Sequence, residues 1–158
     1  MLTTVDLIRQ TRKNLLSVMD SLSEVELNTV PAGFNNNIIW NAAHVVTTIQ
    51  LLCYKNSGLE GYLDERFVVR YRKGSRPEAD ISATEIEGVK KLLLDSADRL
   101  ESDYEAGLFS SYEPYATSFG VKLNTIEDAL GFMVIHEGLH LGYVMALRRA
   151  VKTPERSA

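Results

Sequence analysis

Two of the three histidines in this chain lie four positions apart, in the segment HEGLH at residues 136–140. On an α-helix such a pair lies about 40° apart on one face, so both imidazoles can reach one metal ion. A protein metal site needs at least one further ligand. The remaining histidine, His44, lies in the other strongly apolar segment, and helical bundles build metal sites from facing helices. The sequence therefore predicts a site of His44, His136 and His140 that leaves one or more coordination positions open.

The alternative for each histidine is a hydrogen-bonded place in the protein core. A single histidine in an apolar helix is usually such a core residue. Here all three fall in the two most apolar segments, and burying three unpaired imidazoles costs free energy. Because a shared metal ion removes that cost, we favour the metal site over a histidine-lined core.

Glu137 is the only formally charged residue between Ala129 and Leu147. A buried carboxylate needs a partner, and this one lies about 60° around the helix from His140. We expect it to act as a catalytic acid or base, or to orient a ligand; the alternative is that it reaches solvent.

The pattern H-E-x-x-H is also typical of zinc metalloproteases. Those enzymes take a third ligand downstream and bind peptide along a sheet edge. After His140 the chain has no further histidine and one acidic residue, Glu155, and no edge strand is evident. A protease is therefore disfavoured.

Cys53 is the only cysteine, so an internal disulfide is not possible and a cytoplasmic location is expected. Cys53 follows His44 by nine residues, which is about 180° around a helix. It should therefore pack in the core and face away from the metal. A thiol nucleophile would then have to come from a low-molecular-weight thiol cofactor.

Four helices must position these groups. The first is amphipathic, the second has no charged residue between Phe34 and Tyr54, the third opens with a Ser82–Glu85 capping box, and Asn124 or Thr125 caps the fourth. Their expected bounds are residues 4–22, 36–56, 82–107 and 124–151.

A long connection at residues 57–80, with a short helix near 62–67, joins the second and third helices. No strand pattern suggests a sheet. We therefore expect an all-α four-helix bundle with a long crossover over residues 1–151, followed by a polar tail at 152–158.

Residues 129–147 are apolar enough to suggest a membrane span, but they contain two histidines and a glutamate. A helix apolar all round is more often buried, and two such helices in one small domain predict a homodimer. The alternative is a monomer in which the rest of the chain covers both apolar helices. A net charge of −4 disfavours nucleic acid, and the charged N-terminus has no signal-peptide core.

The order of these motifs resembles the DinB-like family, also called DinB/YfiT, over nearly the whole chain. The likeness rests on "LSEVELNTVPAGFNNNIIWNAAH", in which Trp40 precedes His44 by one turn, on "GSRPEADISATEIEGVKKLL", and on "IHEGLHLGYVMAL". The resemblance implies an up-down-down-up bundle, often dimeric, with a divalent metal, usually zinc or nickel, on His44, His136 and His140. The family is similar in fold to mycothiol-dependent maleylpyruvate isomerase and includes bacillithiol S-transferases.

The expected function is therefore that of a metal-dependent thiol transferase or hydrolase acting on a small molecule. A metal with an open position lowers the pKa of a bound water or thiol. Trp40 and Tyr143 would wall the pocket, although core packing explains them as well. Cations in the long connection would bind an anionic thiol or form ordinary surface pairs: Arg66, Arg70, Arg72, Lys73 and Arg76. A non-catalytic dimeric metal-binding or sensor module, and a metal-free bundle, are the alternatives.

Overall fold

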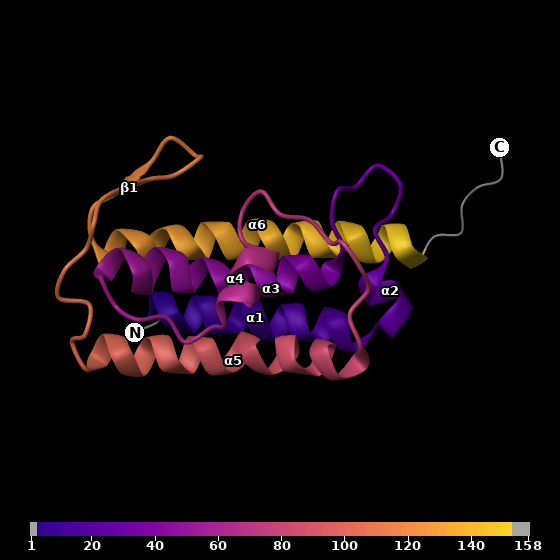
Figure 1. The fold of residues 1–158 in the computed structure, drawn as a ribbon, viewed down its shortest axis with the longest axis horizontal. Coiled ribbons are helices and arrows are strands. Elements are labelled where there is room, and N and C mark those ends of the chain that lie inside the picture. The colour runs from indigo at the N-terminus through magenta and orange to yellow at the C-terminus, as the bar shows by residue number, and fades with distance from the viewer. Residues whose placement is uncertain (1–2, 153–158) are drawn as a thin grey trace.

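The structure, a computed structural model, describes residues 3–152 and is mostly helical (Figure 1). The four helices of more than eight residues lie side by side, α1 and α6 running in one direction and α3 and α5 in the other. Their bounds are α1 Thr4–Asp20, α3 Ile38–Ile49, α5 Ala83–Glu105 and α6 Ile126–Lys152. Most of the predicted tail, residues 153–158, lies outside the described residues.

Shorter elements occupy the connections between these helices. Helix α2 (Glu24–Asn28) precedes α3, and α4 (Glu65–Tyr71) lies in the long crossover. Helix α3 continues through a π-helical turn at Gln50–Tyr54 and a 3₁₀ turn at Lys55–Ser57. A hairpin of two antiparallel strands, β1 (Tyr115–Ala116) and β2 (Lys122–Leu123), precedes α6.

The helix boundaries follow from local capping chemistry. Asn37 caps α3 by accepting a hydrogen bond from the Trp40 amide, and the Ser82–Glu85 capping box opens α5 as the sequence predicted. The extended α3 segment ends at Gly58, whose φ of 71° lies in the left-handed region that favours glycine.

Three details differ from the sequence prediction. Residues 24–28 were expected to be connection, but a second capping box, Ser23 with Glu26, opens helix α2 there. The short crossover helix starts three residues later than expected, because Asp64 caps it. The hairpin was not expected, since strands of two residues leave no periodic pattern in the sequence.

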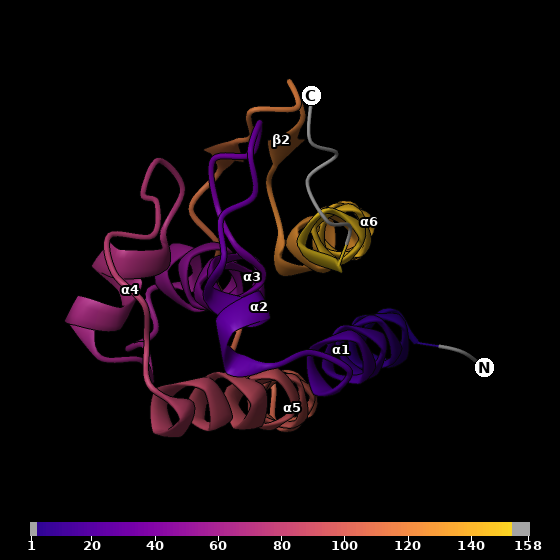
Figure 2. The ribbon, with the colours of Figure 1, turned by 90° about the vertical axis from the view of Figure 1, so that its right-hand side faces the viewer.

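Helix α3 lies at the centre of the fold and holds the first histidine in the core. Every residue from Ile38 to Ile49 is buried, which explains why the sequence carries no charge there. The helix contacts both α5 and α6, and in the end view α3 and α6 lie next to each other with the hairpin above them (Figure 2).

By length and composition α6 could cross a membrane, although only a third of its most apolar stretch is buried within the fold. The core helix of a soluble protein meets the same criteria. Residues of α6 pack against α1 and α3, and its outward side exposes Ile135 and Leu139. The helix therefore has a packed face that carries the two histidines and an apolar face that no other described element covers.

Candidate metal centre

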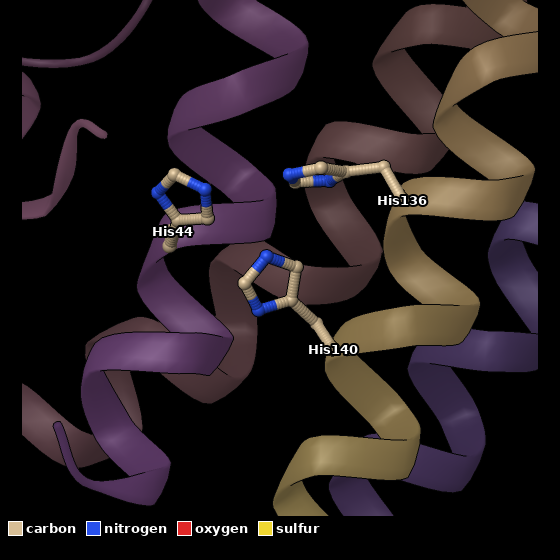
Figure 3. Close-up of side chains that lie close together, drawn as sticks. All are labelled: His44, His136 and His140. Carbon is tan, nitrogen blue, oxygen red and sulfur yellow. The ribbon is translucent and has the colours of Figure 1, made fainter. Parts of the chain in front are cut away.

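Three histidines converge at one point between two helices (Figure 3). His44 comes from α3, and His136 and His140 come from successive turns of α6. One nitrogen of each ring lies within 4.8 Å of the nitrogens of the other two. The structure thus brings together the three residues that the sequence singled out, as a group that could hold one metal ion.

The ring of His44 is held in one tautomer by the backbone of α4. Its Nδ1 lies 2.7 Å from the carbonyl oxygen of Tyr71, which can only accept a hydrogen bond. Nδ1 therefore carries the proton, and Nε2 keeps its lone pair. The Thr48 hydroxyl is 3.3 Å from Nε2, but its single hydrogen goes to the His44 carbonyl at 2.8 Å.

His140 is fixed in the same tautomer by the side chain of Asn41. The amide nitrogen of Asn41 donates to the carbonyl oxygen of Asn37 at 2.8 Å, which determines the orientation of the amide. Its Oδ1 therefore faces His140 and accepts from Nδ1 at 2.8 Å. The Nε2 lone pair of His140 is left free, as in His44.

His136 has a ring nitrogen that lacks a partner. Its Nδ1 is buried and accepts or donates no hydrogen bond within residues 3–152. Unpaired buried polar atoms are costly, and this one belongs to a ring that lies against the rings of His44 and His140, with centroids 5.2 Å and 4.5 Å away. Three neutral imidazoles, two of them oriented by a carbonyl and an amide oxygen, form a donor set that suits a divalent transition metal. The residues present therefore fit the metal.

Burial keeps all three rings neutral. Desolvation lowers the pKa of His136 to about 3 and that of His140 to about 4, and each ring is further disfavoured as a cation by its histidine neighbours. Desolvation also lowers the pKa of His44, against the hydrogen bond to Tyr71. Since only neutral imidazole binds a metal, the cluster is in its ligating form at pH 7.

The two aromatic residues expected to wall the pocket, Trp40 and Tyr143, make other contacts. Trp40 stacks on the ring of His44, with ring centroids 4.6 Å apart, and donates a hydrogen bond from Nε1 to the Ser75 hydroxyl. It therefore packs against a histidine of the cluster. Tyr143 packs edge-on against Phe34. Neither side chain lines the cavity described below.

Glu137 is not part of the cluster. Both of its carboxylate oxygens accept hydrogen bonds from Arg12, at 2.8 Å and 2.9 Å, and both side chains are fully buried. Its position next to His136 places it about 100° around α6, on the side that faces α1. The expectation that Glu137 acts at the metal is therefore not supported, because both of its carboxylate oxygens are hydrogen-bonded to Arg12.

A cavity of about 260 Å³ opens beside His44 and His136, and we call it the histidine cavity. Its other walls are the α3 segment (Thr48, Leu51, Leu52, Lys55, Asn56), the hairpin (Tyr115, Thr117, Ser118, Phe119), Lys73 and Phe132.

The cationic connection contributes one residue to this cavity, Lys73. Arg66, Arg70 and Arg76 line a separate surface groove beside α4. Lys55 and Phe119 were not anticipated from the sequence, and for Phe119 nothing in the sequence showed that the hairpin folds back over α3. Cys53 is buried and does not line the cavity, in agreement with its expected phase.

Comparison with known proteins identifies the family of this chain. No curated protein matches the chain at a significant level. The sequence model of the DinB superfamily matches residues 7–144, which include all three histidines, the whole of α3 and the part of α6 that carries His136 and His140. The chain therefore belongs to the DinB superfamily.

Proposed function

We propose that the protein is a metal-dependent enzyme that holds one divalent ion on His44, His136 and His140 and acts on a small molecule. Zinc and nickel are the expected ions. The observation that carries the proposal is the pair of fixed Nε2 lone pairs on His44 and His140, in a cluster where one nitrogen of each of the three histidine rings lies within 4.8 Å of the other two. Such orienting hydrogen bonds are typical of metal-ligating histidines.

The histidine cavity favours an enzyme over a closed structural site. Catalytic metal sites have three protein ligands and one position open to substrate, and here the cavity adjoins two of the three histidines. When bound, the metal would supply a Lewis acid that lowers the pKa of a water or thiol. The chain contributes orientation of the imidazoles and, through Leu52 and Phe132, an apolar wall that limits access of water.

We propose a thiol transferase or a hydrolase as the reaction class. A transferase of this kind needs a thiol from outside the chain, because Cys53 is buried and desolvation raises the pKa of its thiol to about 12. In the transferase the nucleophile is therefore a low-molecular-weight thiol, and in the hydrolase it is water.

We further propose an up-down-down-up four-helix bundle, located in the cytoplasm and binding neither membrane nor nucleic acid, that forms a homodimer through α6. The outward face of α6 supports the dimer, because Ile135 and Leu139 are 60% and 56% exposed. Sedimentation should show a dimer that Leu139→Lys converts to a monomer. Val25→Lys, at an exposed apolar residue on α2, should leave the dimer intact.

Elemental analysis of protein purified without a histidine tag tests the metal site. We expect about one transition-metal ion per chain, lost in His44→Ala. Val46→Ala is the control, since it makes a buried α3 position smaller without removing a ligand. No metal, and no uptake of added zinc or nickel, would refute the proposal. Bound metal without transfer or hydrolysis across a panel of small electrophiles and esters would favour the non-catalytic sensor module.

A further inference from the structure

The charges around the histidine cavity are of one sign. Its lining includes Lys55 and Lys73 and no carboxylate among the residues that the structure describes. The whole chain has 21 acidic residues against 17 lysines and arginines, so an acid-free lining differs from the rest of the molecule. Neither lysine forms an ion pair within residues 3–152, whereas Lys90 and Lys91 on α5 both do. The cavity thus presents two uncompensated cations.

Much of the remaining lining of the cavity is apolar. Leu51, Leu52 and Phe132 lie on the two helices that carry the histidines. Phe119 reaches over from the hairpin and packs edge-on against Phe132, with ring centroids 5.4 Å apart. Phe132 in turn lies 6.0 Å from the ring of His136. An apolar surface therefore leads from the hairpin to the metal position.

The size of the cavity limits what it can hold. A volume of 260 Å³ is about what eight or nine water molecules occupy in the liquid. A small organic molecule fits this space. Ligand sites of this kind combine an apolar lining with a few polar groups that fix orientation.

From these observations we propose that the histidine cavity binds a small organic anion. Its carboxylate or phosphate lies at Lys55 and Lys73, and its apolar body lies against Leu52, Phe119 and Phe132. This inference deepens the proposed function by naming a substrate class, and it rests on that function only for the position of the reacting group beside the histidines.

The anion is held by lysines and not by arginines. Lysine is a compact point charge, whereas arginine presents a planar fork that matches two carboxylate oxygens. Two lysines therefore attract a carboxylate and a phosphate without a strong geometric preference for either. The shared chemistry is a negative charge on a small apolar body.

Titration calorimetry with three matched probes tests this inference. Benzoate, phenyl phosphate and neutral benzamide each carry one phenyl ring, and each is titrated into chelator-treated protein and into the same protein reloaded with zinc. We expect both anions to bind the metal-free protein at least tenfold more tightly than benzamide does. Lys55→Gln/Lys73→Gln should remove this preference, and Lys13→Gln/Lys91→Gln, which loses the same charge elsewhere, should keep it.

A second variant tests the apolar wall. Phe119→Ala removes an exposed hairpin ring and spares the core, so the protein should remain folded. The variant should bind phenyl phosphate several-fold more weakly than the wild type and should bind inorganic phosphate with unchanged affinity. An equal loss for both ligands would overturn the placement of the apolar body.

The outcomes separate this inference from the proposed function. Lysine-dependent binding of anions to a protein that takes up no metal would support the anion cavity and refute the metal enzyme. Anion binding that appears only after zinc is added and is insensitive to Lys55 and Lys73 would overturn the inference and leave the metal site standing. Equal affinity for benzamide and the anions, or no binding of any probe, would also overturn it.

Discussion

The guanidinium of Arg12 and the carboxylate of Glu137 form an ion pair that no solvent reaches, one residue from a proposed metal ligand. The Arg12 Nη2 to Glu137 Oε1 distance is 2.8 Å, and both side chains are fully buried. Arg12 also donates to the carbonyl oxygen of Leu93 and to the hydroxyl of Ser96 on α5. The pair therefore links α1, α5 and α6.

Breaking this pair should cost stability and leave the metal in place. Burial raises the pKa of the Glu137 carboxyl, and the guanidinium of Arg12 opposes that rise. Glu137→Leu leaves a buried cation without a partner, so we expect a loss of about 3–5 kcal/mol in the free energy of unfolding. Chemical denaturation measures this loss, and elemental analysis of the folded variant should still find one metal per chain.

The double variant Arg12→Met/Glu137→Leu provides the control. It removes both charges at once, so it should be more stable than Glu137→Leu alone. A Glu137→Leu protein of normal stability that has lost its metal would show that the carboxylate serves the metal site after all.

Asn41 should determine how tightly the metal is held. Its Oδ1 accepts the hydrogen bond that orients His140, so Asn41→Leu should weaken metal affinity by about 10–100-fold. Asn41→Asp keeps an acceptor at the same place and should retain most of the affinity. Competition with a chromophoric zinc chelator measures both variants. Identical affinities in Asn41→Leu and the wild type would show that this bond does not orient the ligand.

The metal-free protein should lose stability as the pH falls from 6.5 to 4. In the unfolded chain the histidines become protonated below their ordinary pKa of 6.5, whereas in the folded protein burial lowers the pKa of His140 to about 4 and that of His136 to about 3. The unfolded state then binds more protons, so stability decreases by up to about 1.4 kcal/mol per pH unit for each such histidine.

Urea denaturation at several pH values, with chelator present, measures this slope. Carboxylates whose pKa is lowered in the folded protein add to the loss at the acid end, Glu26 and Glu85 among them. His136→Gln removes one titrating ring and leaves those carboxylates, so its slope should be shallower than that of the wild type. An unchanged slope would contradict the assigned cause.

The thiol of Cys53 should be unreactive while the protein is folded. The side chain is fully buried and the pKa of the thiol is raised to about 12, mainly by desolvation, so almost no thiolate exists at pH 8. Iodoacetamide should label Cys53 slowly in the native protein and rapidly in urea. Fast native labelling would make an internal thiol available and weaken the argument for an external one.

Much of the helical framework and the histidine cluster could be predicted from the sequence. Caps such as Asn37 and Ser82 act locally, and the pairing of His136 with His140 follows from helical periodicity alone. The meeting of His44 with that pair depends on how two helices face each other, for which the indications were a shared lack of charge and the resemblance to the DinB-like family.

Arg12 was missed although a signal was present. It occupies the apolar stripe of α1 between Ile8 and Leu15, where a charged residue requires a buried partner. Linking Arg12 to Glu137, the single charge in the apolar part of α6, would have placed the carboxylate away from the metal. The hairpin could not be placed, because no periodic pattern reports how a loop folds back across a helix.

The π-helical turn at Gln50–Tyr54 gives α3 a defined place where its length can vary. Hydrogen bonds in such a turn join residues five apart instead of four, so it holds one residue more than a regular turn. Removing one residue there would restore an ordinary α-helical turn and leave His44 before it and Lys55 after it on their present faces. The same deletion between His44 and Thr48 would rotate the histidine by about 100° relative to everything that follows. Single-residue length differences among related chains should therefore collect at this turn.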